Sequence, residues 1–143
     1  MTKKLTRLET IEAKQAEAEF ARQQEAETEL ERLMAQAKAD CETLQFDFDD
    51  ISWDDANAIA DILSREFVAS EEGDHDAINE ARAEMRGFLA RIVEYVPDEW
   101  FVSSLNGATK DFTDPQLYRS IKATKIGRVT AAMNYALGEE QKN

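Results

Sequence analysis

The side chains that most often do chemistry in proteins are scarce in this sequence, which has a single histidine, His75, and a single cysteine. His75 lies between Asp74 and Asp76, a group of residues that suggests metal binding. Adjacent residues in a short turn rarely converge on one ion, however, and zinc or calcium sites need ligands at wider spacings that are absent here. We therefore predict no metal site. The run from Gly73 to Asp76 is interpreted as the end of one helix and the cap of the next.

Cys41 is a poor candidate for a nucleophile. A reactive thiol needs a cationic neighbour or a helix N-terminus to lower its pKa, whereas Asp40 and Glu42 flank Cys41 and would raise it. We expect Cys41 to be a small apolar residue on one face of a helix. The five glycines are scattered singly and cannot build a phosphate-binding loop. The sequence therefore predicts a protein that is not an enzyme, with no catalytic residues, no cofactor and no small-molecule substrate.

The charge of the chain points to particular partners. Its formal net charge is −13. Nucleic-acid binding depends on clustered cations that neutralise phosphates, so we expect no nucleic-acid partner. An acidic surface suits basic protein surfaces, or mimicry of the charge of DNA. No apolar run approaches the roughly 20 residues that span a bilayer, and Glu9 and Glu12 interrupt the position of a signal-peptide core. We expect no membrane and a cytoplasmic location, or one within an assembled particle.

The elements that would position these residues are all helical, so the predicted fold class is all-α. Residues 1–46 are rich in strong helix formers and contain neither glycine nor proline. They predict one long, charged, coiled-coil-like helix from about Lys3 to Leu44. A sustained coiled coil needs three or four heptads of large apolar residues. Leu5, Leu8 and Ile11 make only a short seam, and a second seam, at spacings of three and four, lies in the second half of the helix. That seam, which we expect to dock on the same chain or on a neighbouring subunit, comprises Ala26, Leu30, Leu33, Ala37, Cys41 and Leu44.

Residues 47–143 are predicted to form a compact body of three helices, at about 53–69, 77–96 and 115–137. Ser52 is a good N-cap for the first helix, and Asp55 can complete a capping box with it. The expected core face of this helix consists of Trp53, Ala56, Ile59, Ala60, Leu63 and Phe67.

The ends of the other two helices also follow from the sequence. Pro97 ends the second, because the residue before a proline avoids the helical region. Asp114 or Thr113 starts the third with Pro115 in its first turn, and Gly138 lies just past its end.

The segment before the first body helix alternates aromatic and acidic residues from Phe46 to Asp50. We expect an extended linker whose two rings join the core, and an acidic–aromatic docking motif is the alternative.

Two further groups are candidate protein contacts. Trp100 and Phe101 would make good interface anchors if they were exposed, although we expect them to be buried. Arg119, Lys122, Lys125 and Arg128 recur every three residues and form the one basic ridge in the sequence. This ridge would bind an acidic surface, such as the N-terminal helix of another copy, or else be a solvated helix face. Together with Leu30, Leu33 and Leu44, these six residues are the candidate interaction residues.

Two short motifs carry a resemblance to a known family. They are Ser52-Trp53-Asp54-Asp55 and the run from Phe88 to Trp100, which includes Val96-Pro97-Asp98-Glu99-Trp100. This pattern, over about residues 50–130, resembles small acidic helical proteins encoded among the structural genes of tailed phages, in the position of the tail assembly chaperone. The acidic helical rod is also similar to phage scaffolding proteins.

The resemblance implies a non-enzymatic accessory protein of virion assembly, located in the host cytoplasm or in a particle. Its partners would be tail or capsid subunits and further copies of itself. A coiled-coil adaptor would use the same physics in another setting. A different class of function is an acidic inhibitor that mimics DNA. It requires the carboxylates of residues 47–55 and 71–76 to line one surface at phosphate-like spacing.

Overall fold

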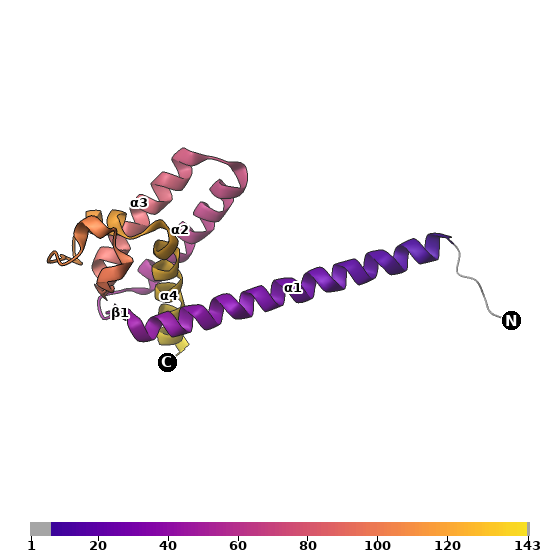
Figure 1. Cartoon of the computed structure of the whole chain (residues 1–143), viewed down its shortest axis with the longest axis horizontal. Coiled ribbons are helices and arrows are strands. Elements are labelled where there is room, and N and C mark those ends of the chain that lie inside the picture. Colours follow the sequence, from indigo (N-terminus) through magenta and orange to yellow (C-terminus); the bar gives the residue numbers. More distant parts are fainter. Residues whose placement is uncertain (1–6, 143) are drawn as a thin grey trace. The chain divides into compact units, whose positions relative to one another are not determined.

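A computed structural model describes the backbone of residues 7–142 and the side chains of residues 11–142. The structure confirms the all-α class, since the elements within residues 7–142 are helices apart from one small two-stranded sheet (Figure 1). The long helix α1 spans Arg7–Thr43. Its predicted start near Lys3 lies outside the described residues.

Helix α1 contributes to two compact units, the first ending at Ala35 and the second beginning at Gln36. The sequence predicts a long charged helix over residues 1–46 and a helical body over residues 47–143. The second unit includes the last turns of α1, where Ala37 and Asp40 are buried, and Leu44 just after them, which is buried too.

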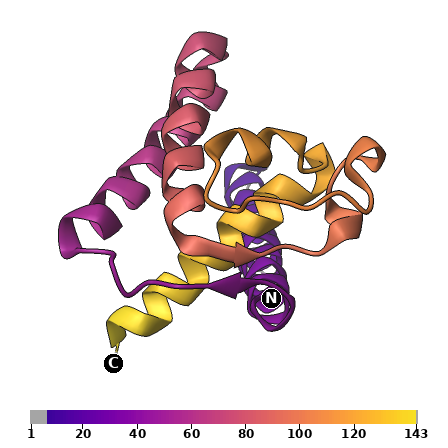
Figure 2. The same ribbon diagram turned by 90° about the vertical axis from the view of Figure 1, so that its left-hand side faces the viewer.

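The second unit is built around a hairpin of α2, Trp53–Glu72, and α3, His75–Ile92, which lie side by side in Figures 1 and 2. The predicted capping box is confirmed: the Asp55 amide donates to Ser52 Oγ, and the Ser52 amide donates to the Asp55 carboxylate, both at 3.1 Å. Gly73 ends α2 with a φ of 69°, a left-handed conformation that glycine adopts without steric cost. Asp74 then caps α3 by accepting from the Ala77 amide.

The expected core face of α2 is partly wrong. Trp53 and Phe67 are 70% and 66% exposed. Ala60 is also exposed, and Leu63 is half-buried. The buried residues of this helix are Ala56, Ile59, Ile62 and Ala69. The buried face is therefore rotated toward the side that carries Ile62 and Ala69.

Residues 93–95 correct the predicted extent of the second body helix. The helix ends at Ile92, and Val93–Tyr95 forms strand β2, antiparallel to β1 at Gln45–Phe46. The Asp47 amide also donates to the Ile92 carbonyl at 2.8 Å. Val and Tyr favour strands, and this pairing, made with a segment far away in the sequence, ends the helix well before Pro97. The Phe46 and Phe48 rings pack against the core as expected, with their centroids 5.9 Å apart.

The predicted helix at 115–137 is two elements. The 3₁₀ helix η3 spans Pro115–Ser120 and α4 spans Ala123–Lys142. Between them Ile121 has extended backbone and forms an isolated antiparallel bridge with Phe101. The Lys122 amide donates to the Trp100 carbonyl at 2.8 Å, which fixes the break. Gly138 lies inside α4 rather than past its end.

Two shorter 3₁₀ helices, η1 at Asp98–Trp100 and η2 at Ser103–Leu105, connect β2 to η3. Lys110 ties this connection together: its ammonium pairs with Asp98 and donates to the Leu105 carbonyl at 3.0 Å. The core below it includes side chains from α2, α3, η1, η3 and α4. The largest fully buried ones are Tyr118, Phe101, Ile59, Leu89, Ile92, Met133, Val96 and Val129.

Candidate interaction surfaces

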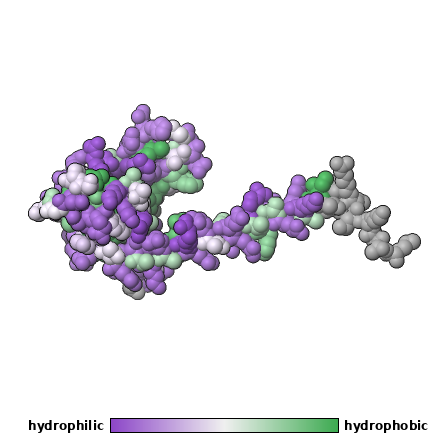
Figure 3. All heavy atoms as spheres, in the orientation of Figure 1, coloured by the Kyte–Doolittle hydropathy of each residue, from purple (hydrophilic) through white to green (hydrophobic). Residues whose placement is uncertain are grey.

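The first candidate surface belongs to α1 within the unit that ends at Ala35. Side chains of residues 11–35 are all exposed, and hydrophobic atoms appear among hydrophilic ones along this helix in Figure 3. Leu30, Leu33 and Met34 are 58%, 53% and 51% exposed. Leu33 and Met34 lie three and four residues after Leu30, so both neighbour Leu30 on one side of the helix. We call these three residues the apolar stripe. The Leu30–Leu33 seam predicted its position, and Met34 was missed although it directly follows Leu33.

Charged side chains flank the apolar stripe. Arg32 donates to both carboxylate oxygens of Glu29, with Nε at 3.1 Å. This hydrogen-bonded contact raises the pKa of Arg32 and lowers that of Glu29. Paired charges of opposite sign beside apolar positions are the arrangement that sets partner choice in coiled coils. The stripe thus has both an apolar centre and a charged edge.

Three of the candidate interaction residues are core residues instead. Leu44, Trp100 and Phe101 are 3%, 6% and 0% exposed. Trp100 and Phe101 are buried because the backbone on either side of them pairs with the segment around Ile121. Leu44 follows the end of α1 inside the second unit. Their side chains contribute to stability and leave little surface for a partner.

The basic ridge does not form one continuous surface, because the break at Ile121 divides it. Arg119 lies on η3 and donates to Gln116 Oε1 at 3.2 Å. Lys125 and Arg128 lie on α4, where both cations approach the Trp100 ring, at 5.3 and 4.8 Å from its centroid. Lys122 is exposed at the break itself. Three of the four cations therefore make contacts within the chain.

Arg128 makes the strongest internal contact of the ridge. Its guanidinium donates to both Asp40 oxygens, at 2.6 and 3.0 Å. Asp40 is only 3% exposed and also accepts from Gln36 Nε2 at 3.0 Å. A bidentate arginine–carboxylate pair has specific geometry, so this contact attaches the end of α1 to α4. No local signal in the sequence predicts this ion pair, because its two partners are 88 residues apart.

Cys41 lies beside this ion pair and behaves as expected. Its thiol donates to the Ala132 carbonyl at 3.3 Å. Burial, together with the charge of Asp40, raises the pKa of the thiol. This is the opposite of what an activated nucleophile requires.

Residues 71–76, four of which are acidic, lie at the tip of the α2–α3 hairpin. Residues 71–76 are exposed there, and His75 is the first residue of α3. Within residues 7–142 no three histidine, cysteine or carboxylate side chains come together as a metal-binding group.

The two acidic runs that a DNA mimic would need lie at opposite ends of α2. This helix has 20 residues, which corresponds to a length of about 30 Å. Asp55 is committed to Ser52 and to Arg91, whose hydrogen bond is the main cause that lowers the pKa of Asp55 to about 2. Asp74 is committed to the cap of α3.

Comparison with known protein families, with curated proteins and with solved structures finds no match. None of the helices within the described residues has the length and apolar character needed to cross a membrane.

Proposed function

We propose that this chain acts without catalysis, as an assembly or adaptor protein that works through protein–protein contacts. The apolar stripe carries the proposal. Single exposed apolar side chains are common on soluble proteins, but neighbouring ones on a helix face indicate a contact surface. Fully burying one leucine or methionine side chain stabilises a complex by about 1.5–3 kcal/mol, so three of them can drive a moderate association.

The first partner of the stripe is a second copy of the same helix. Two stripes facing one another would bury six large apolar side chains, and Glu29 and Arg32 beside them offer reciprocal ion pairs. In the setting that the phage resemblance implies, the dimer would then hold a tail or capsid subunit during virion assembly. That setting is part of the proposal and is supported by the acidity, the long helix and the two short motifs.

Light scattering coupled to size-exclusion chromatography tests self-association on the full chain. We expect a dimer or larger oligomer at micromolar concentration, and a monomer for the variant Leu30→Glu/Leu33→Glu, because it places charges in the stripe. Phe20→Glu is the control on the same helix, since Phe20 is 61% exposed and lies about three turns before Leu30. It should retain the oligomer. A wild-type chain that stays monomeric at every concentration rules out the homodimer and with it this proposal.

A further inference from the structure

We propose that a pocket beside Trp53 binds a short basic segment of a partner protein, one in which a large apolar residue adjoins a lysine or arginine. The pocket lies entirely within the second unit, between the linker before α2, the first turn of α2 and the end of α4. It shares no residue with the apolar stripe, so the two proposals can fail separately.

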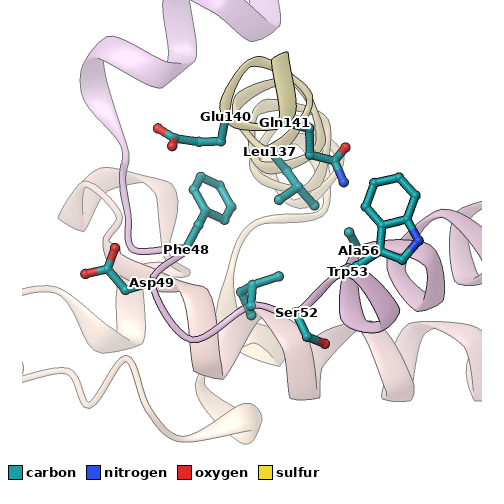
Figure 4. A pocket seen from close by; sticks show the side chains of 9 residues that line it. Phe48, Asp49, Ser52, Trp53, Ala56, Leu137, Glu140 and Gln141 are labelled. Atoms are coloured by element: carbon teal, nitrogen blue, oxygen red, sulfur yellow. The ribbon is translucent and has the colours of Figure 1, made fainter. Parts of the chain in front are cut away.

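The geometry of the pocket provides the apolar part of the site. Its volume is about 290 Å³. In Figure 4 the Phe48 ring and the Leu137 side chain point toward one another, and the Trp53 indole lies at the opposite end from Phe48. The full lining is Phe48, Asp49, Ile51, Ser52, Trp53, Ala56, Leu137, Glu140 and Gln141. A pocket of this size and lining suits one apolar side chain of a protein partner, and lies at the lower end of the volumes of small-molecule sites.

The charged residues of the lining are acidic and suit the basic residue of the partner segment. Asp49 and Glu140 lie on the Phe48 side of the pocket, and among residues 11–142 no lysine or arginine lines it. Within residues 11–142 neither carboxylate has an ion-pair partner, whereas Asp55 nearby is paired with Arg91. A cation that enters beside Phe48 would therefore meet two carboxylates and no competing positive charge.

The exposure of Trp53 indicates that the pocket surface binds a protein partner. It is 70% exposed at the first position of α2, although burial of an indole is strongly favourable. Tryptophan is one of the residue types enriched among the hot-spot residues of protein interfaces.

The same chain shows that an indole and a carboxylate together hold a cation. Arg128 lies 4.8 Å from the centroid of the Trp100 ring and pairs with Asp40. In the pocket at Trp53 the indole and the two carboxylates lie at opposite ends instead, so the apolar residue of a partner segment would lie beside Trp53 and its cation beside Asp49 and Glu140.

Nuclear magnetic resonance of the full chain tests the proposal, because the chain has two tryptophans and hence two indole N–H signals. The probe is the synthetic peptide acetyl-KRLLKR-amide. We expect the Trp53 signal to shift saturably while the Trp100 signal stays in place. Acetyl-KRSSKR-amide, which lacks the apolar residues, and acetyl-EELLEE-amide, which lacks the cations, should bind at least tenfold more weakly.

Variants separate the parts of the site. Asp49→Asn/Glu140→Gln should weaken binding of the basic peptide about fivefold, as expected for two surface ion pairs. Trp53→Ala should weaken it about tenfold or more in calorimetric titrations. Phe67→Ala is the matched control on the same helix, being 66% exposed but outside the pocket, and should leave binding unchanged.

Three results would overturn the proposal. One is the absence of a saturable Trp53 shift, and another is an unchanged affinity in the double variant Asp49→Asn/Glu140→Gln. The third is a Trp53 shift on simple dilution of the chain without peptide, because the occupant would then be a second copy. If the stripe variant Leu30→Glu/Leu33→Glu still binds the peptide, the pocket stands even where the proposed self-association fails.

Discussion

At the residue scale, Asp40 shows what the end of α1 requires of its neighbours. A buried carboxylate is costly unless it is paired and hydrogen-bonded. Arg128 and Gln36 supply those bonds, and Arg128 is itself partly exposed with its guanidinium over Trp100. The pair is therefore a structural contact within the second unit, and only a small part of Arg128 remains for a partner.

Replacing Arg128 by methionine should lower the free energy of unfolding by about 2 kcal/mol, because Asp40 would stay buried with one neutral hydrogen-bond donor. Urea denaturation of the full chain measures the change. The double variant Asp40→Asn/Arg128→Met should recover more than half of the loss, since no unpaired charge remains. Equal losses in the single and double variants would show that the ion pair is not what stabilises this contact.

At the element scale, the helix ends that the sequence predicts correctly are those that depend on local residues. Ser52, Asp55, Gly73 and Asp74 act within a few residues of their own positions, and each ends or begins a helix as expected. The recurrence of apolar residues every three or four positions likewise predicts helices, but it leaves their rotation open, so the expected core face includes Trp53 although this residue is exposed.

What could not be predicted depends on partners that are distant in the sequence. Residues 93–95 form a strand because Gln45–Phe46 pairs with them. The helix is broken at Ile121 because Ile121 forms a bridge with Phe101. Of the candidate surfaces, the exposed Leu30 and Leu33 followed from their spacing. The pocket at Trp53 did not, since it needs Leu137 and Glu140 from the far end of the chain.

The glycines of the helices give a prediction for these elements. Gly127 lies within α4, and a Cβ added there meets no atom within 4 Å. Gly127→Ala should raise the free energy of unfolding by about 0.5–1 kcal/mol, because alanine loses less conformational entropy in a helix. Gly73→Ala should lower it by about 1 kcal/mol, because its φ of 69° strains any residue with a Cβ. Thermal and urea denaturation of both variants check the opposite signs.

At the scale of the whole molecule, the two units differ in what holds them together. The second unit has a contiguous hydrophobic core. Residues 11–35 have only exposed side chains, so helix propensity and ion pairs such as Glu29–Arg32 are what support the first unit. Helices without tertiary packing are only marginally stable in water.

Hydrogen exchange followed by mass spectrometry should show this difference. In dilute solution the amides of residues 11–35 should exchange much faster than those of α2, because local opening of an unpacked helix costs little. Raising the concentration should slow exchange around the apolar stripe, and Leu30→Glu/Leu33→Glu should abolish that slowing. Strong protection of residues 11–35 at all concentrations would contradict the assignment of the stripe as an association surface.

The position of Cys41 makes its labelling rate a measure of how often the end of α1 separates from α4. It is the single cysteine, its thiol is bonded to the Ala132 carbonyl, and its neighbourhood disfavours the thiolate. A thiol-specific dye therefore labels the folded chain slowly, and labelling accelerates whenever the end of α1 leaves α4. The labelling half-life therefore measures how often that contact opens. It can be measured in mixtures and with bound partners, and no engineered cysteine is needed.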